Sequence, residues 1–225
     1  SVQTPALRVI GNIVTGDEIQ TQVAISCGCL PALKHMLDNH PKKSIKREVC
    51  WTLSNITAGS QQQIQAVLNA SIIDSLILHM KESEFDVRKE AAWAIANATS
   101  SGSPEQITTL VNKGCIPPLC ELVQAPDVRV VAVSLEGLEN ILKNGEALKQ
   151  HNNFVNPFAD IIEKCGGLNR IESLSNHPSV PIYEKARGLV AQYFNAEDDQ
   201  SLQPQQTGDA FSFETSAPSG GFSFQ

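Results

Sequence analysis

The sequence predicts an all-α solenoid of short helical repeats, followed by a disordered C-terminal tail. Three observations lead to this prediction. A motif containing tryptophan and asparagine recurs about every 42 residues, apolar residues follow helical spacing up to residue 194, and the composition changes abruptly at Asn195. Repeats of this kind stack on one another and so bury a continuous core that no single repeat could form alone.

The repeat motif has the form basic-basic-Glu-x-x-Trp-x-x-x-Asn-x-Thr. It occurs twice in full, with its tryptophan at Trp51 and Trp93, and twice with another residue in the tryptophan position. A period of about 40–47 residues made only of helical segments is typical of the HEAT and armadillo classes. The motif asparagines recur at intervals of 43, 42 and 43 residues, at Asn12, Asn55, Asn97 and Asn140.

Helix boundaries can be predicted within each repeat. Pro31 and Pro117 belong in first turns, where the missing N–H costs nothing. A glycine follows the motif helix in three copies and predicts its end; these are Gly16, Gly59 and Gly102. The last interval carries about ten additional residues, somewhere in 143–165. The expected repeat region is 1–194, with copies at roughly 1–27, 28–69, 70–112, 113–165 and 166–194.

The charge and hydropathy of the chain argue against nucleic acid and membranes as partners. Its 225 residues include 24 acidic and 17 basic side chains, for a net charge of −7. Phosphate binding needs a basic face, and no apolar run is long enough to span a bilayer. The chain starts without Met or a signal peptide, and we expect it to be a fragment that lacks its N-terminal part.

Residues 195–225 have a different composition from the repeats. They are rich in Gln, Ser, Gly, Pro and acidic residues, and contain no Lys, Arg, Ile, Val or Met. Such a segment cannot bury enough apolar area to offset the entropy of ordering it, so we expect a disordered acidic tail. Its two Phe-Ser-Phe motifs, at Phe211 and Phe222, are either inert, docked on a receptor or folded back on the repeats.

The sequence contains no motif of an enzyme, a cofactor site or a metal site. The six cysteines form no Cys-x-x-Cys pair and the five histidines are scattered. Most of the cysteines lie in apolar helical runs, where a free thiol behaves as a small hydrophobe. We therefore expect no catalytic residue, no cofactor and no metal ligand.

The repeat motifs resemble the armadillo repeats of importin-α, the nuclear-import adaptor. The runs that carry the resemblance are Thr4–Gly16, Trp51–Gly59 and Lys89–Asn97, and the resemblance covers about residues 6–194. It implies a right-handed superhelical armadillo solenoid with three helices per repeat, whose third helices line a concave groove. It also implies that this chain corresponds to about the sixth to tenth repeats, which include the minor cargo-binding site.

The residue types in the motif suit an extended basic peptide. A Trp and an Asn four residues apart share one helix face. The Asn amide can hold both the N–H and the C=O of a peptide unit, and an indole face attracts a Lys or Arg by ~0.5–2 kcal/mol. The glutamates three residues before each Trp can pair with the same cations. The predicted peptide-binding residues are Arg8, Asn12, Val14, Thr15, Gly16, Thr21, Glu48, Trp51, Ser54, Asn55, Glu90, Trp93 and Asn97.

The residues that follow Asn12 match a further feature of the family. The resemblance implies that Val14, Thr15, Gly16 and Thr21 form a small polar pocket, with backbone carbonyls, for one favoured lysine.

Two residues depart from the motif. Arg8 and Glu136 occupy the tryptophan position in the first and fourth copies. We expect Arg8 to pair with an acid of the ligand or of a neighbouring repeat. Because Glu136 interrupts the aromatic series, we expect the groove to end near Glu136 and Asn140.

The resemblance implies a set of partners and a cellular location. The partners are cargo proteins with basic nuclear localisation signals, importin-β through a segment missing from this chain, the export receptor that recycles the adaptor, and nucleoporins. The protein would shuttle between cytoplasm and nucleus. Two alternatives stay open. This half mainly docks the export receptor or a nucleoporin, or the chain is a catenin-like armadillo scaffold for acidic or mixed peptides, which the glutamates of the predicted groove disfavour.

Each motif also has a simpler structural interpretation. The tryptophans could belong to the core, the asparagines could be exposed and idle, and the glutamates could only pair with helix neighbours. The basic run Pro41–Arg47 resembles a short localisation signal, but the repeat register places it at a helix start, which favours an ordinary solvated surface.

Overall fold

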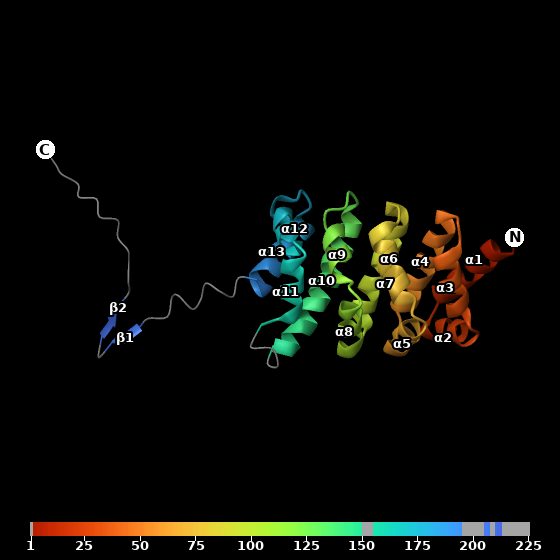
Figure 1. Cartoon of the computed structure of the whole chain (residues 1–225), viewed down its shortest axis with the longest axis horizontal. Helices are drawn as coiled ribbons and strands as arrows, with labels where there is room; N and C mark the ends of the chain where they lie inside the picture. Colours follow the sequence, from red (N-terminus) through yellow and green to blue (C-terminus); the bar gives the residue numbers. More distant parts are fainter. Residues whose placement is uncertain (1, 150–154, 195–204, 208–209, 213–225) are drawn as a thin grey trace.

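The computed structural model describes residues 2–149, 155–194, 205–207 and 210–212. Its helices lie side by side along one long axis, from α1 at one end to α13 at the other (Figure 1). The helices are α1 (Gln3–Val14), α2 (Glu18–Ser26), α3 (Cys29–Asn39), α4 (Lys43–Thr57), α5 (Gln61–Asn69), α6 (Ile72–Glu82), α7 (Phe85–Ser101), α8 (Pro104–Asn112), α9 (Ile116–Leu122), α10 (Val128–Leu148), α11 (Pro157–Lys164), α12 (Gly167–Ser173) and α13 (Val180–Tyr193), with a 3-10 turn at Leu174–Asn176.

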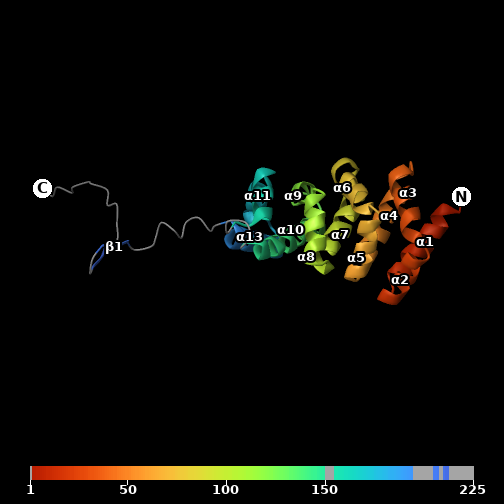
Figure 2. The ribbon, with the colours of Figure 1, turned by 60° about the horizontal axis from the view of Figure 1, so that its bottom comes forward.

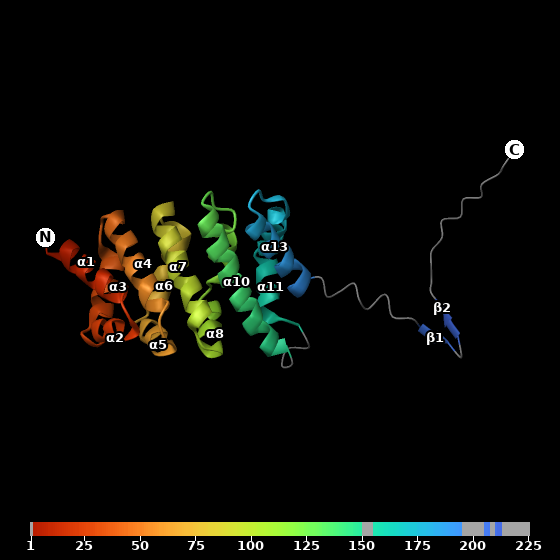
Figure 3. The same ribbon diagram turned by 180° about the vertical axis from the view of Figure 1, so that it is seen from behind.

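After α1, the helices form triplets that stack along the array. The third helices pack on one another in the order α1, α4, α7, α10 and α13, while each shorter first or second helix packs on the helices of its own and the adjacent triplet. Figure 2 shows this order from another side, and Figure 3 shows from behind that α4, α7 and α10 lie next to one another. The structure therefore confirms the predicted all-α solenoid, and the third helices give it one continuous face.

Burial of apolar side chains along the third helices explains why the helices stack. In α4, Val49, Leu53 and Ile56 are completely buried, and they lie on one helix face because they are three or four residues apart. The buried apolar side chains of all triplets form one cluster along the array. Four of the six cysteines belong to it, as predicted for thiols in apolar helical runs.

A buried glutamine links each of the triplets that begin with α5 and α8 to the triplet before it. Gln63 and Gln106 complete capping boxes at the starts of α5 and α8. Their Nε2 groups also reach back across the stack: Gln63 donates to the carbonyl of Glu18 at 2.9 Å, and Gln106 to that of Gln61 at 2.8 Å. Each glutamine therefore satisfies one helix start and fixes the neighbouring triplet at the same time.

The glycines predicted to end the motif helices do follow them, but for a different reason than expected. None of Gly16, Gly59 and Gly102 is among the described residues with a left-handed backbone. At Gly16 and Gly59, a Cβ would collide with the capping glutamine side chain of the next helix. Close approach of that glutamine, rather than a left-handed turn, favours glycine at these two positions.

The additional residues of the last interval lengthen α10 and the segment after it. α10 has 21 residues, compared with 15 in α4 and 17 in α7. Its end is held by Asn156, whose Nδ2 donates to the carbonyl of Leu142 at 2.9 Å and to Glu146 at 2.7 Å. Gly145 leaves room for this side chain, because a Cβ there would overlap the Asn156 amide.

The tail was expected to be disordered, and the structure places one element in it. Two short strands, β1 (Gln205–Thr207) and β2 (Ala210–Ser212), pair antiparallel. An isolated two-stranded hairpin is at most marginally stable in water, so this pairing does not create a second domain. Most of the Phe-Ser-Phe residues lie outside the described residues.

Candidate peptide-binding face

The two tryptophans lie on the face formed by the third helices. Trp51 and Asn55 are four residues apart on α4, and Trp93 and Asn97 have the same spacing on α7. The Trp51 ring lies across α1, since a Cβ on Gly11 would be only 2.7 Å from its Cζ3 atom. Trp93 is 37% exposed. Neither indole belongs to the buried core, so both can contact a ligand.

The motif asparagines have part of their hydrogen-bonding capacity unused. Asn97 donates from Nδ2 to the carbonyl of Ser54 in the preceding third helix at 2.9 Å, and Asn55 donates to the carbonyl of Trp51 at 3.2 Å. Within the described residues, the Oδ1 atoms of both accept no hydrogen bond, and each amide keeps a second N–H. These groups remain available to a peptide backbone.

Asn12 and Ser54 have different environments from these two asparagines. Asn12 is exposed, and its side chain makes no hydrogen bond to the described part of the chain. Ser54 is 6% exposed, and its hydroxyl donates to the carbonyl of Trp51 at 2.8 Å. Ser54 therefore contributes a small side chain and a backbone acceptor for Asn97 to this face, rather than an exposed hydroxyl.

The pocket residues predicted after Asn12 do come together. Val14, Thr15, Gly16 and Thr21 line a hollow of about 540 Å³ between the ends of α1 and α4, and Asn55 forms part of the same wall. Thr21 is buried, and its hydroxyl faces the carbonyl of Val14 at 3.5 Å. The last carbonyl groups of a helix have no partner within it, so those at the ends of α1 and α4 can accept hydrogen bonds from a cation in this hollow.

Two acidic residues of this hollow were not among the predicted site residues. Asp17 and Glu18 line it immediately after Gly16. Asp17 is also the N-cap of α2, where its carboxylate accepts from the Gln20 N–H at 2.8 Å. Because Asp17 and Glu18 directly follow the predicted pocket residues in the sequence, their acidic side chains could have been recognised there as candidate partners for the cation.

Arg8 forms an ion pair with a neighbouring repeat. Its Nε lies 3.4 Å from Oε1 of Glu48, so α1 and α4 are joined by charge on this face. The side chain of Glu48 is only 19% exposed, whereas that of Arg8 is 72% exposed. Of the two partners left open for Arg8, the structure shows the acid of a neighbouring repeat.

Glu90 occupies the corresponding position on α7 but has no such partner. It makes no ion pair or hydrogen bond within the described residues, and burial raises the pKa of its carboxyl group above the usual value. Lys89, Arg47 and Arg129 lie close enough to oppose this shift. An acid that is partly desolvated and unpaired gains from any cation that a ligand brings to it.

The predicted end of the groove differs from the segments before it. Glu136 is exposed on α10, in the position of the tryptophans. Asn140 donates to the hydroxyl of Thr99 at 3.4 Å, a longer contact than that of Asn97. The adjacent Glu139 pairs with Lys143 at 2.8 Å and with Lys185 of α13 at 2.6 Å. Charge pairing replaces aromatic side chains here.

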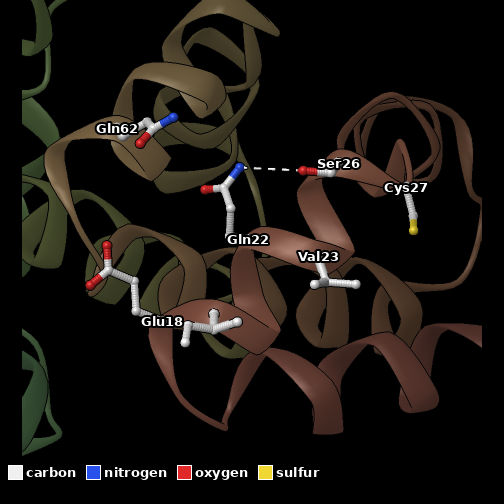
Figure 4. Close-up of a pocket in the computed structure, with 7 residues that line it drawn as sticks. Glu18, Gln22, Val23, Ser26, Cys27 and Gln62 are labelled. Carbon is white, nitrogen blue, oxygen red and sulfur yellow. Dashed lines mark hydrogen bonds between the residues drawn. The ribbon is translucent and has the colours of Figure 1, made fainter.

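A second hollow, of about 400 Å³, lies on α2 outside the third-helix face. Figure 4 shows Val23, Glu18, Gln22 and Cys27 around it, with Gln62 opposite. Ile19 and Val23 are 75% and 56% exposed, and Gln22 donates to Ser26 at 3.5 Å. It contains none of the predicted site residues.

The described part of the chain contains neither a cluster of metal-binding side chains nor a helix suited to a membrane. Among the described residues, no group of three His, Cys, Asp or Glu side chains could hold a metal ion. None of the described helices combines the length and apolar character needed to cross a bilayer.

Comparison with protein-family models decides the family. The armadillo/beta-catenin-like repeat matches three times, at residues 17–58, 60–100 and 103–143, and an atypical Arm repeat matches 156–206. The chain belongs to the armadillo-repeat family. The matches start at the first helix of each triplet, whereas the copies proposed from the sequence start near the second helix, so the two divisions differ in phase.

Curated relatives of this armadillo chain are plant importin subunits. It is 51% identical over 232 aligned residues to importin subunit alpha-1b of Oryza sativa subsp. japonica and to importin subunit alpha-4 of Arabidopsis thaliana. It is 53% identical, over 90% of its length, to importin subunit alpha-1a of Oryza sativa subsp. japonica. The first two alignments include the whole chain but only 43% of each relative, in a C-terminal part. The predicted resemblance to importin-α is confirmed.

Solved structures with the same fold include designed proteins. One designed armadillo repeat protein superposes with a TM-score of 0.71 at 26% identity. The superposition covers 83% of the present chain and 73% of the designed protein. A second, solved in complex with peptide (KR)4, gives a TM-score of 0.61 at 24% identity, over 84% and 91% of the two chains. At these identities the structural similarity supports the assignment of the armadillo fold and nothing more specific.

Proposed function

We propose that the third-helix face binds an extended peptide rich in Lys and Arg, and that the chain acts as part of a nuclear-import adaptor. The observation that carries the proposal is the juxtaposition of the Trp–Asn series with the polar hollow at Val14, Thr15 and Thr21. The series suits any extended backbone, and the hollow suits a single ammonium group.

Each component of the face would have a distinct role in binding. Asn55 and Asn97 hold peptide units through their unused Oδ1 and N–H groups. Trp51 and Trp93 pack against the methylene stems of Lys or Arg and attract their charges. Glu90 pairs with one cation, and the carbonyls at the end of α1 receive another, together with Asp17 and Glu18.

The wider role rests on the curated relatives. They are named importin subunits alpha, and this chain spans 43% of the length of the first two. In such an adaptor the bound peptide would be the nuclear localisation signal of a cargo protein. Importin-β, the export receptor and nucleoporins would be the other partners, with shuttling between cytoplasm and nucleus.

A second candidate function is supported by the change of chemistry at α10. Beyond Trp93, the face carries Glu136 and the ion pairs of Glu139 in place of an indole. That surface would dock the recycling export receptor or a nucleoporin rather than cargo. A catenin-like role with an acidic peptide is less compatible with Glu48, Glu90 and Glu136 on one face.

The test is a titration of the chain with a fluorescent peptide that contains two Lys/Arg clusters, alongside an acidic peptide of the same length. We expect only the basic peptide to bind, and more weakly at high salt, because its charges stay partly solvated. Trp51→Ala with Trp93→Ala should weaken binding by at least about tenfold, a loss of ~1–2 kcal/mol of cation–aromatic attraction and packing.

The matched control is Leu78→Ala, which removes an apolar side chain that is 48% exposed on α6, outside the third-helix face. It should leave the affinity unchanged. If the folded protein bound neither peptide, or if the Leu78 variant lost as much affinity as the tryptophan variant, cargo binding by this face would be excluded and the docking role would be favoured.

A further inference from the structure

The N-terminal ends of α4 and α7 carry the same pattern of cations but differ in how these are neutralised. Lys46 and Arg47 precede Trp51 by five and four residues, and Arg88 and Lys89 precede Trp93 by the same intervals. The two pairs therefore occupy equivalent positions in adjacent repeats. Any acidic partner that the pair on α7 has and the pair on α4 does not have is a group that the α4 pair lacks.

On α7 both cations are paired. Arg88 lies 3.2 Å from Glu121 of the following triplet, and Lys89 lies 3.1 Å from Asp86 in its own helix. The hydrogen bond from Lys89 holds the pKa of the Asp86 carboxyl group below its usual range. This end of the helix is electrically balanced.

On α4 neither equivalent cation forms an ion pair with a described residue. Arg47 is exposed, and it is near enough to Asp86 and Glu90 to favour their ionised forms without contacting either. Lys42 is also exposed and unpaired in the described part of the chain, and Lys43 alone reaches an acid, Glu84, at 2.6 Å. The position equivalent to Asp86, seven residues before the tryptophan, is Ser44.

We propose that Ser44 is a phosphorylation site for a protein kinase that recognises basic residues, and that its phosphate supplies the anion that Asp86 supplies in the next repeat. Lys42 and Lys43 stand directly before the serine, and residues 41–44 are all exposed. The Ser44 hydroxyl, in the first turn of α4, makes no hydrogen bond to the described residues, so no side-chain contact of the serine has to be broken for the reaction.

In the reaction, the Ser44 hydroxyl oxygen forms a bond to the γ-phosphorus of ATP. The bond to the ADP leaving group breaks, and the hydroxyl proton passes to the kinase's catalytic base. The product carries about −1.5 to −2 charge at pH 7 and three acceptor oxygens. Residues three apart on a helix are neighbours, so this group faces Arg47 as Asp86 faces Lys89.

The modification would also change the proposed peptide-binding face. Arg47 and Trp51 are four residues apart on the same side of α4. While Arg47 is unpaired, it repels a basic peptide that approaches Trp51. A phosphate on Ser44 removes that repulsion, and we expect binding of the basic peptide to tighten about threefold at low salt. This consequence rests on the proposed function, whereas the modification itself does not.

The first experiment uses the intact chain, the catalytic subunit of cAMP-dependent protein kinase and ATP, followed by peptide mass spectrometry. We expect about one phosphate per chain, located on Ser44, and none in the Ser44→Ala variant. A phosphate found instead on Ser173, which has Arg170 three residues before it, would overturn the proposal. So would an unmodified chain in a reaction where a control substrate peptide is fully phosphorylated.

The second experiment compares thermal unfolding of the phosphorylated and unmodified chains. We expect phosphorylation to raise Tm by about 2–4 °C, and Ser44→Asp, which copies Asp86, to give part of that increase. Arg47→Ala should abolish the increase without preventing phosphorylation, while Lys89→Ala, the matched control, should preserve it. An increase that persists without Arg47 would exclude the proposed pairing. Because Tm is measured without peptide, this result is independent of cargo binding.

Discussion

The segments of the third-helix face at the two ends of the Trp–Asn series share a backbone but not a chemistry. Between α1 and α4, Thr21 lines a polar hollow and Arg8 neutralises Glu48. Between α7 and α10, the residue equivalent to Thr21 is the buried Ile107, and Glu90 has no ion-pair partner in the described chain. Repetition of the helices fixes where side chains stand, and single substitutions decide what each segment can bind.

The largest effect is expected when a substitution makes the first segment resemble the later ones. Thr21→Ile installs the residue found at the equivalent Ile64 and Ile107. We expect the basic peptide to bind about tenfold more weakly, because an ammonium group in the hollow would lose a polar wall and keep part of its desolvation cost, ~1–3 kcal/mol. The measurement is the peptide titration, with Tm recorded for both proteins.

Ile64→Thr is the reciprocal control for this prediction. It places a hydroxyl at a completely buried position one triplet further on, so it should reduce stability without a comparable loss of affinity. Equal affinity for the wild type and the Thr21 variant would mean that the hollow does not receive a peptide side chain.

The later segment can be made to resemble the earlier ones with Glu136→Trp. This substitution adds an indole at the position where Trp51 and Trp93 stand in the preceding repeats. An exposed cation–aromatic contact contributes ~0.5–1 kcal/mol, so a basic peptide long enough to reach α10 should bind about two- to fivefold more tightly. A shorter peptide that ends before α10 is the control. If both peptides gained the same affinity, the added indole would not be contacting the part of the longer peptide that reaches α10.

Sequence patterns predicted the fold, the third-helix face and the pocket residues after Asn12, because the repeat places equivalent side chains at equivalent positions. They could not identify the partner of Arg8, since that contact joins residues 40 apart across the stack. The position of Asp17 after Gly16 indicates a helix cap, a role it has in the structure, and does not by itself indicate that it also lines the hollow. The exposure of Ser54 could not be predicted either, since it depends on how closely α7 packs on α4.

The smallest expected effect concerns Glu90 and pH. Burial raises the pKa of its carboxyl group, so ionisation opposes folding. Its contribution to stability is complete below the pKa of an unfolded glutamate and is lost as the pH rises through the higher folded value. We expect Glu90→Gln to flatten the dependence of Tm on pH above about pH 4, where an unfolded glutamate begins to ionise.

The control for the Glu90 prediction is Glu48→Gln, at the equivalent position next to Arg8. It should lower Tm slightly at neutral pH, because it removes a partly exposed ion pair. Identical pH profiles for the two variants would show that their environments do not differ as described.

The capping glutamines fix the spacing between neighbouring triplets. Gln63 and Gln106 tie the start of one triplet to the first helix of the triplet before it, through hydrogen bonds of 2.9 and 2.8 Å. A sliding motion between neighbours would leave buried amides without acceptors, so the spacing of successive third helices resists stretching. An extended chain advances at a fixed rise per residue. Third helices at a fixed spacing can therefore contact the side chains of an extended peptide in register, without a change of structure for each ligand.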